Sequence, residues 1–476
     1  MCAIAGMIGL SYDRDIVGLM LDTMKRRGPD GSGAFLDDRC ALLHSRLAVI
    51  DPENGSQPMF MDWKEDKLCI VYNGELYNTA ELRDELIKNG HTFKTRTDTE
   101  VVLHAYAQWG ERALLKFNGI FAFAIWEHES KRLFLTRDRM GVKPLFYKIH
   151  EDGFIFASEI KTILKYPTVN AQIDESGIAQ LIMLAPGRMP GSGVFRDILE
   201  LEPGCCGYYY SNRWHQKRYW KLSDAEHTDS LEDTAKKVRY LVTDAIFRQT
   251  VSDVPLGTFL SGGLDSSLIS TLCAEVFRNR GEQLQTFSVD YLNNELYFQP
   301  GKFQPDADNS YINLMREHIH SSHNVTILNA EQLVENLYEA VIARDLPGMA
   351  DVDSSLLAFC KDVRKNVTVA LSGECADEIF GGYPWYRDPA VRSLDGFPWA
   401  QNTQYRASLI NQECLKKNKA LDFVADLYQQ TIHEADILPN QEPVERRMKE
   451  MVNLNHRWFM QTLLDRKDRM SMYSAL

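Results

Sequence analysis

The sequence lacks long hydrophobic runs and an excess of positive charge. No apolar stretch approaches the roughly 18 to 20 residues needed to cross a bilayer, and the longest candidates, residues 117–126 and 178–185, are short and interrupted. The formal net charge is −13, whereas docking on nucleic acid or anionic lipid requires a positive footprint. We therefore expect neither a membrane nor a nucleic-acid partner.

Paired cysteines and a leader segment are also missing. The nine cysteines are an odd number spread along the chain without paired spacing, which is typical of reduced thiols rather than of a disulfide framework. The first residues have no charged segment and too short an apolar stretch for a signal peptide. Both observations predict a cytoplasmic protein.

The composition is that of a folded, globular chain. With 476 residues, 44% of them hydrophobic and 25% charged, the chain is long enough for two or three domains. The first 200 or so residues contain short stretches of alternating apolar residues, typical of antiparallel strands, at 4–8, 42–50, 68–72, 121–126 and 133–136. Helices are predicted after Asn78, a candidate N-cap, and after Thr97 or Asp98. Sheets with helices on their faces form a layered α+β domain.

The second half alternates strands with helices. A helix at 232–248 precedes predicted strands at 255–260, 285–289, 324–328 and 367–371, with helices starting after Ser266 and covering 310–318, 331–343 and 354–365. This alternation predicts an α/β, doubly wound parallel sheet. Beyond Pro384 the pattern is helical only. Residues 203–221 have no clear period, so we predict domains at 2–205 and 231–476 joined by a linker at 206–230.

A phosphate-binding loop is predicted where the first of these parallel strands ends. The segment is Ser261-Gly262-Gly263-Leu264-Asp265-Ser266-Ser267. Its glycines allow a tight turn that points N–H groups at an anion, its serines add hydroxyl donors, and the following helix contributes its N-terminus. The loop lacks the lysine of a Walker A motif, which favours a pyrophosphate held by backbone and hydroxyl groups.

A second loop follows the last predicted strand. Ser372-Gly373-Glu374-Cys375-Ala376-Asp377-Glu378 leads into Gly381-Gly382-Tyr383. Asp265 and Asp377 therefore both lie at carboxyl ends of strands, where a hydrated Mg²⁺ that bridges phosphates prefers one or two carboxylates. Helix capping is an alternative role for these acidic residues, equally open for Glu378 and less so for Asp377.

Together the two loops resemble those of a known enzyme group. The first resembles the pyrophosphate loop of ATP pyrophosphatases, which activate a carboxyl or carbonyl group by adenylation, and the second narrows the resemblance to asparagine synthetases and their β-lactam synthetase relatives. This resemblance implies that Leu260 and Val289 frame the adenine and that Glu374 acts on the acyl-adenylate. The implied ATP contacts are Leu260, Ser261, Gly262, Gly263, Asp265, Ser266, Ser267, Val289, Ser372 and Gly373.

Cys2 is the candidate nucleophile of the first half. Removal of Met1 would give Cys2 a free α-amine, which can take the thiol proton and activate the sulfur. A cysteine at position 2 is a weak signal by itself, but it is followed by the ordered motifs Arg27-Gly28-Pro29-Asp30, Arg46-Leu47-Ala48-Val49-Ile50-Asp51, Asn73-Gly74-Glu75-Leu76-Tyr77-Asn78, Thr97-Asp98 and Arg137-Asp138-Arg139-Met140-Gly141-Val142-Lys143-Pro144-Leu145. Residues 2–200 thereby resemble the N-terminal-nucleophile glutaminase domain of class II glutamine amidotransferases.

This second resemblance implies a role for each matched residue. Cys2 attacks the side-chain amide of glutamine, and the Asn73 side chain and Gly74 N–H form the oxyanion hole. Arg46 grips the α-carboxylate of glutamine, while Glu75 and Asp98 hold its α-ammonium. The implied glutamine contacts are Arg46, Leu47, Ala48, Val49, Ile50, Asn73, Gly74, Glu75 and Asp98. From the residues alone, a type I′ turn at Asn73-Gly74, a helix N-cap at Asp98 and a surface ion pair at Arg46 also stay open.

The two resemblances predict one glutamine-dependent asparagine synthetase: a layered α+β N-terminal-nucleophile glutaminase followed by an α/β synthetase. Ammonia released at Cys2 would displace AMP from a β-aspartyl-adenylate made from aspartate and MgATP. The implied cofactors are ATP and Mg²⁺, the partners are the small molecules glutamine, aspartate and ATP, and a homodimer is allowed. The alternatives are an amidotransferase for another carboxylate, a glutaminase with a defective second domain, and a nucleotide-sensing regulator.

Two departures from the family pattern stand in the second half. Cys375 occupies the position where the family has glycine after the loop glutamate, and it would be strained if that position needs positive φ. Family chains also continue past the segment matched by 464–472, with further synthetase core and a catalytic lysine. The resemblance therefore implies a synthetase domain that is incomplete at its C-terminus.

Overall fold

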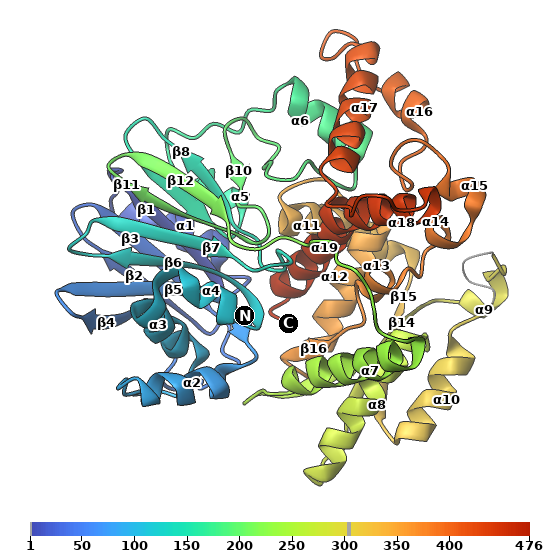
Figure 1. Cartoon of the computed structure of the whole chain (residues 1–476), viewed down its shortest axis with the longest axis horizontal. Coiled ribbons are helices and arrows are strands. Elements are labelled where there is room, and N and C mark those ends of the chain that lie inside the picture. The colour runs from blue at the N-terminus through green and yellow to red at the C-terminus, as the bar shows by residue number, and fades with distance from the viewer. Residues whose placement is uncertain (1, 302–305) are drawn as a thin grey trace.

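The computed structural model describes residues 2–301 and 306–476 of the chain. Figure 1 shows two halves: a strand-rich half built from the first part of the sequence and a half dominated by helices built from the rest. Helix α19 (Met460–Tyr473), the last element, lies where the two halves meet. Among the residues described, no helix is long and apolar enough to cross a membrane. All nine cysteines are free thiols.

The first half contains two antiparallel sheets of six strands each. The first sheet has the order β10 (Leu199–Glu200), β8 (Phe146–Ile149), β9 (Phe154–Ala157), β1 (Ala3–Ile8), β3 (Cys40–Arg46), β2 (Gly31–Leu36). The second has the order β12 (Arg213–Arg218), β11 (Cys205–Tyr210), β7 (Arg132–Arg137), β6 (Gly119–Glu127), β5 (Asp66–Leu76), β4 (Met59–Trp63). A buried cluster from both sheets, including Ile4, Leu42, Val71, Ala124 and Phe156, fills the space between them. The sheets therefore stack face to face.

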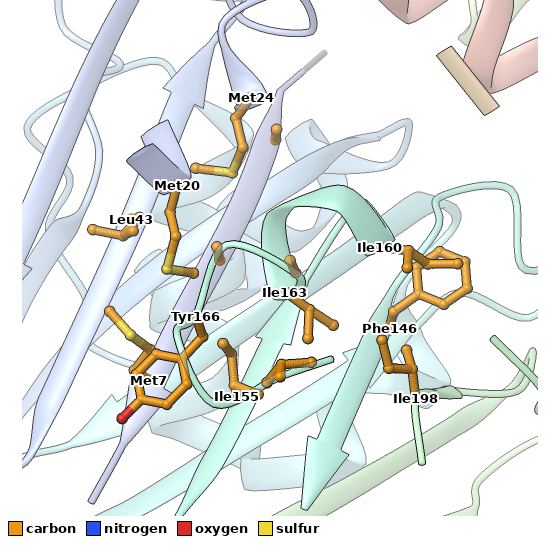
Figure 2. Packing of buried hydrophobic residues seen from close by; sticks show 14 of the residues in the cluster. Met7, Met20, Met24, Leu43, Phe146, Ile155, Ile160, Ile163, Tyr166 and Ile198 are labelled. Atoms are coloured by element: carbon orange, nitrogen blue, oxygen red, sulfur yellow. The ribbon is translucent and has the colours of Figure 1, made fainter. Parts of the chain in front are cut away.

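Helices cover the outer faces of this sandwich. Helices α1 (Arg14–Met24) and α5 (Ile160–Ile163) pack on the first sheet, where Met7, Met20 and Ile155 belong to one buried cluster (Figure 2). Helices α2 (Thr79–Lys88) and α3 (Asp98–Trp109), with η1 (Gly110–Arg112) and α4 (Ala113–Lys116), cover the second sheet. The result is a four-layer αββα arrangement, which confirms the predicted layered α+β domain.

The second half is built on a parallel sheet of four strands. Its order is β15 (Ser322–Leu328), β14 (Gln285–Tyr291), β13 (Leu256–Phe259), β16 (Val369–Leu371). The chain runs outward from β13 to β15 and then returns to place β16 on the other side of β13. The connecting helices are α8 (Leu264–Asn279), α9 (Asn294–Tyr297), α10 (Asn309–Ile319), α11 (Ala330–Arg344) and α12 (Asp351–Val363), with α7 (Leu231–Arg248) before the sheet. The predicted parallel α/β sheet is confirmed.

The remainder of the second half is helical, as predicted. Its elements are α13 (Ala376–Phe380), α14 (Pro384–Arg387), α15 (Pro389–Arg392), α16 (Thr403–Ser408), α17 (Lys417–His433), α18 (Pro443–Leu454), η3 (Asn455–Phe459) and α19. A buried cluster joins these helices to α6 (Glu175–Ala179) and η2 (Gln180–Leu184) of the first half through residues such as Met183, Trp385 and Trp458. The two halves are thus joined by a common apolar core.

Three local expectations need correction. The predicted linker at 206–230 begins later, because β11 and β12 form a hairpin that pairs with β7 inside the second sheet. Its turn, Ser211-Asn212, takes positive φ without glycine, so the usual turn signal was absent. The predicted strand at 42–50 ends at Arg46. Asn78 does stand before α2, yet its side chain bonds to Lys116 and Asn118 rather than capping the helix.

Candidate active sites

Cys2 lies at the start of β1, and Asn73 faces it from β5 of the other sheet. The Cys2 backbone N–H donates to Asn73 Oδ1 at 3.0 Å, and the Cys2 thiol is 3.8 Å from the carbonyl oxygen of Leu47. Asn73 is fully buried, and its Nδ2 has no hydrogen-bond partner in the described part of the chain. A buried amide donor without a partner costs free energy unless a ligand oxygen satisfies it. This arrangement fits an oxyanion hole beside a nucleophile.

Asn73 and Gly74 are not a turn, because both lie inside the eleven-residue strand β5. A Cβ on Gly74 would come within 2.4 Å of the Ile120 carbonyl oxygen on the neighbouring strand, so only glycine fits. The type I′ turn considered for Asn73-Gly74 is therefore wrong.

Burial raises the pKa of the Cys2 thiol, which means that the sulfur needs a base to become a nucleophile.

Arg46 ends β3 beside the same pocket. Its guanidinium donates to the backbone carbonyls of Pro52 at 2.6 Å, Ile50 at 3.3 Å and Asp51 at 2.8 Å. It forms no ion pair with any carboxylate among residues 2–301 and 306–476. Gly55 permits this packing, since a Cβ there would lie 2.2 Å from Nη2. The positive charge is thus fixed in place and available to an anionic ligand.

Glu75 and Asp98 contribute two acidic groups to the lining of the same pocket. Asp98 is the first residue of α3, while Thr97 is the N-cap and accepts from Glu100 N–H. Asp98 also accepts from the Tyr72 hydroxyl and from Leu76 N–H, both at 3.1 Å. Burial, and then the negative charge of Asp98, raise the pKa of Glu75, and burial also raises the pKa of Asp98. Two buried carboxylates that disfavour each other's ionisation are a ready site for a cation.

These residues line one small cavity of about 30 Å³. It is bounded by Cys2, Arg46, Leu47, Ile50, Gly55, Gln57, Tyr72, Gly74, Glu75, Thr97, Asp98 and Thr99. Of the predicted glutamine contacts, Ala48, Val49 and Asn73 lie outside this lining. Ala48 N–H donates to Asp30, the Val49 carbonyl accepts from Asp253 N–H, and Asn73 is fully buried next to Cys2. Sequence reasoning missed Gln57, Tyr72 and Thr99, which carried no recognised motif.

The second site lies where the parallel sheet reverses its strand order. The loop after β13 and the loop after β16 flank the crevice between these adjacent strands, which is where open α/β sheets bind ligands. In the first loop Gly262 has φ +80°, and a Cβ there would meet Tyr311 Cβ at 2.8 Å. Ser261 N–H donates to Ser266 Oγ at 3.2 Å, and the two hydroxyls are 3.0 Å apart. The turn is therefore held in shape by its own serines before any ligand enters.

The cavity over these loops measures about 420 Å³. Its lining includes the predicted ATP contacts Leu260, Ser261, Gly263, Asp265, Ser266, Val289, Ser372 and Gly373. Gly262 and Ser267 do not line it: Gly262 packs against Tyr311, and Ser267 belongs to the first turns of α8. Helix α8 starts at Leu264, earlier than predicted, which places Asp265 in its first turn.

Asp265 and Asp377 both face this cavity. Burial and the charge of Asp377 raise the pKa of Asp265, so the two carboxylates are close enough to repel each other. Gly382 closes over Asp377, since a Cβ there would overlap the carboxylate. The Asp265 and Asp377 carboxylates lie next to the candidate phosphate-binding loop. This arrangement fits Mg²⁺, which binds through one or two carboxylates plus phosphates. The residues present thus suit the metal that the sequence predicted.

Both halves of the chain match known protein families. Residues 1–220 match the family model described as a glutamine amidotransferase domain, and residues 237–476 match the family model described as asparagine synthase. This chain belongs to the asparagine synthase family. It is 45% identical to asparagine synthetase [glutamine-hydrolyzing] 3 of Bacillus subtilis over 100% of this chain and 78% of the relative.

Other matches are more distant. Asparagine synthetase [glutamine-hydrolyzing] 1 of Bacillus subtilis is 35% identical over 79% of this chain and 57% of its own length. Among solved structures, the B. subtilis glutamine phosphoribosylpyrophosphate amidotransferase complexed with ADP and GMP covers 68% of this chain and 81% of its own, with 16% identity and a TM-score of 0.37.

Within the asparagine synthase half, Glu374 has partners that the sequence did not reveal. Arg466 donates to one carboxylate oxygen at 2.9 Å and Lys467 approaches the other at 3.4 Å, both from α19. Lys467 also lies over the Phe259 ring, 4.5 Å from its centre. The Glu374 carboxylate is therefore paired with two cations at the cavity wall. Arg466 and Lys467 lie 92 and 93 positions after Glu374 in the sequence. They contact it because α19 packs against the loop that carries Glu374.

Glu378 differs from Glu374 in having no such support. It is 6% exposed, and neither carboxylate oxygen accepts a hydrogen bond from the residues that the structure describes. Burial raises its pKa, with further contributions from Glu374 and Asp377, although the nearby Tyr383 hydroxyl opposes the shift. A buried carboxyl with a raised pKa at a cavity wall is a candidate for accepting a proton in a reaction.

Cys375, the departure from the family pattern, has φ +71° and ψ 8°. This left-handed conformation favours glycine, so the strain expected for a side chain here is confirmed. The Cys375 thiol is buried against Met460 and Leu463 of α19. Its packing offsets part of the backbone strain.

Proposed function

We propose that this chain makes asparagine from aspartate, glutamine and ATP, releasing glutamate, AMP and pyrophosphate. One observation carries the proposal: a single chain holds both a preformed cysteine–asparagine pair beside a small pocket lined by one guanidinium and two carboxylates, and a two-loop phosphate crevice. The glutaminase part comprises residues 2–218 and the synthetase part residues 231–476, with 219–230 as the linker. We further propose a cytoplasmic location, because the substrates are small metabolites. We also propose a homodimer, on the family resemblance alone.

In the glutaminase site, removal of Met1 leaves Cys2 with an α-amine. That amine accepts the thiol proton, and the thiolate attacks the amide carbon of glutamine to form a tetrahedral oxyanion. Asn73 Nδ2, which has no other partner in the described structure, and Gly74 N–H donate to that oxyanion. The amide nitrogen takes the proton and leaves as ammonia, and water then releases glutamate from the thioester.

The rest of the pocket orients glutamine. The Arg46 guanidinium, fixed by three backbone carbonyls, binds the α-carboxylate through its charge and the N–H groups that these carbonyls leave free. Glu75 and Asp98 bind the α-ammonium, whose charge removes their mutual repulsion. Both ends of the amino acid are thereby recognised, which selects free glutamine over a glutamine side chain within a protein.

In the synthetase site, the backbone and serines of residues 261–267 cradle the phosphates of ATP, with Asp265 and Asp377 as the ligands that would hold Mg²⁺. When bound, the metal supplies charge neutralisation for the β- and γ-phosphates. Leu260 and Val289 frame the adenine. The side-chain carboxylate of aspartate attacks the α-phosphorus and pyrophosphate leaves, with the Glu374 carboxylate and its two cations ordering this edge of the cavity.

Glu378 is the proposed proton acceptor in the last step. Ammonia attacks the acyl carbon of the aspartyl-adenylate, the nitrogen gives one proton to the Glu378 carboxylate, and AMP leaves with the electron pair of the C–O bond. Its buried position and the absence of a hydrogen-bond partner among the described residues support this role over Glu374, whose carboxylate is engaged by two cations. A Glu378→Gln variant should still release pyrophosphate while asparagine formation slows.

The deciding experiment measures aspartate-dependent pyrophosphate release, first with glutamine and then with ammonium as nitrogen source. Equal amounts of AMP, pyrophosphate and asparagine from both sources would support the proposal. Pyrophosphate release with another carboxylate but not with aspartate would identify a different acceptor. Glutamate without pyrophosphate would mark a glutaminase alone, and ATP binding without either product would mark a nucleotide sensor.

A further inference from the structure

Helix α19 of the synthetase half inserts a carboxylate into the glutaminase half. Asp468 is 4% exposed and lies 2.6 Å from Arg27 Nη1 and 2.8 Å from Lys143 Nζ, both of which come from the glutaminase half. Arg27 is completely buried and Lys143 is 1% exposed. Figure 1 shows α19 at the junction of the two halves. Three charged groups are thus sealed inside the domain interface.

Arg27 connects this interface to the nucleophile. Its Nε donates to the backbone carbonyl oxygen of Cys2 at 3.3 Å, on the residue that carries the thiol and the prospective α-amine. Its Nη1 takes Asp468 at 2.6 Å, while the only other carboxylate near it in the described chain, Glu159, is 3.9 Å away. The orientation of the guanidinium is therefore set mainly by Asp468.

The ion pairs are strong enough to keep this geometry. Burial by itself would raise the pKa of Asp468, but Arg27 and Lys143 beside it hold that pKa well below its usual range. Removing the Asp468 carboxylate would leave two buried cations without a close counter-charge, which the protein interior tolerates poorly. The Arg27 side chain can therefore not adopt another conformation without breaking the interface.

We propose that Asp468 is a positioning residue for the glutaminase nucleophile: a carboxylate of the synthetase half fixes Arg27, which in turn fixes the backbone of Cys2. The inference rests on the proposed role of Cys2 as the nucleophile. It means that the glutaminase site is complete only when α19 is docked against it.

The same helix reaches the other site at the two preceding residues. Arg466 and Lys467 hold Glu374 in the nucleotide cavity, so residues 466–468 of one helix position groups in both sites. A rigid helix places these contacts in fixed relation to one another. Ammonia production is thereby tied structurally to the element that shapes the site where ammonia is consumed.

The test compares Asp468→Asn with Asp465→Asn in the full-length chain. Asp465 is the matched control because it is equally buried on α19 and pairs with three cations, Arg188, Arg344 and Arg469, none of which contacts Cys2. The readouts are kcat and KM for glutamine hydrolysis, and the labelling rate of Cys2 by a diazoketone analogue of glutamine, followed by mass spectrometry. Thermal unfolding reports the stability of each variant.

For Asp468→Asn we expect kcat and the labelling rate to fall about 10- to 100-fold, with KM for glutamine changed less than about twofold, because the glutamine contacts are untouched. Asp465→Asn should lower stability but leave labelling near the parent rate. Asp468→Glu should restore part of the loss. Unchanged labelling in Asp468→Asn, or equal losses in both variants, would overturn the proposal.

Arg27→Lys keeps the argument testable if Asp468→Asn does not fold. Lysine retains the charge that faces Asp468 but lacks the Nε–H that reaches Cys2, so folding should persist while Cys2 labelling slows. Labelling at the parent rate in this variant would also contradict the proposal. If Cys2 were not the nucleophile at all, the parent protein itself would show no labelling, which separates failure of the proposed function from failure of this inference.

Discussion

The two pockets of this protein are built in opposite ways. The glutaminase pocket is a cavity of about 30 Å³ whose key side chains stand on strands or directly beside them, and its nucleophile is only 7% exposed. The nucleotide cavity is about 420 Å³, is formed by loops at strand ends, and has one end of its wall on α19. Regular strands fix the shape of the first site, whereas loops form much of the second.

The charges differ in the same sense. The lining of the glutaminase pocket contains one cation and two carboxylates, a match for the two charged ends of an amino acid. Among the residues that the structure describes, the lining of the nucleotide cavity contains one cation, Lys467, and five carboxylates: Asp265, Asp308, Glu374, Asp377 and Glu378. A polyphosphate can enter such an acidic cavity only with its own cations. The first site therefore carries both charges that an amino acid would need, whereas the proposed ATP site would need a metal to balance its charge.

The sharpest separation of the two pockets comes from Cys2→Ala. Glutamine-dependent synthesis should fall about a thousandfold or more, because no other group can take the nucleophile's place. Ammonium-dependent synthesis should remain, since the nucleotide cavity is untouched. Both rates are measured by pyrophosphate release, with Cys414→Ala, at an exposed cysteine, as the control. Loss of both activities in a folded variant would contradict the two-site scheme.

The preformed nature of the glutaminase pocket is tested by Asn73→Asp. This change keeps an oxygen that accepts from Cys2 N–H but removes the free Nδ2 donor. We expect kcat for glutamine hydrolysis to fall about 100- to 1,000-fold, the usual effect of losing an oxyanion-hole donor. Asn78→Asp, on the same side of the domain but with its amide engaged elsewhere, serves as the control. A fall in both variants would mean that Nδ2 has no special role.

The dependence of the second pocket on a metal is tested by Asp265→Asn. Aspartate-dependent pyrophosphate release should fall about 10- to 100-fold and require more Mg²⁺, because one oxygen ligand loses its charge. Glutamine hydrolysis should not change. Asp290→Asn is the matched control, since Asp290 bonds to Asn294 and Asn309 and lies outside the cavity lining. An unaltered Mg²⁺ requirement would remove Asp265 from the metal site.

A pH titration tests the charge match in the glutaminase pocket. The free protein raises the pKa of Glu75 and Asp98, whereas a bound α-ammonium favours their ionised forms, so glutamine binding should release a proton. The KM for glutamine should therefore fall as pH rises toward 8, by up to about tenfold per pH unit below the raised pKa. In Glu75→Gln the KM should be higher and its pH dependence weaker. A KM independent of pH in the parent protein would contradict the release of a proton from Glu75 or Asp98 on glutamine binding.

The smallest effect concerns the strained loop of the second pocket. Cys375→Gly relieves a left-handed backbone but loses a buried thiol, so the free energy of unfolding should change by less than about 1 kcal/mol. Cys375→Val should cost about 2 kcal/mol or more, because a β-branched side chain tolerates positive φ poorly. Chemical denaturation of both variants provides the comparison. Equal stability of the two would mean that the loop readily changes conformation.

Much of both folds could be predicted from local pattern. Alternation along 4–8 and 121–126 predicted strands that the structure contains, and the regular exchange of strands and helices after residue 232 predicted the parallel sheet. The hairpin at 205–218 was missed because its turn has no glycine or proline at the usual place. Periodicity reports which face of an element is buried, and it says nothing about pairing when a turn signal is absent.

The candidate sites divide in the same way. The sequence by itself determined the chemistry at hand: a cysteine at position 2, a serine–glycine loop after a strand, and acidic residues at two strand ends. Only the tertiary structure decided that Asn73 Nδ2 lacks a partner among the described residues, that Glu374 pairs with Arg466 and Lys467, and that Asp468 reaches Arg27. Contacts such as Arg27 with Asp468, 441 positions apart, depend on how α19 packs between two domains, and no local preference encodes that packing.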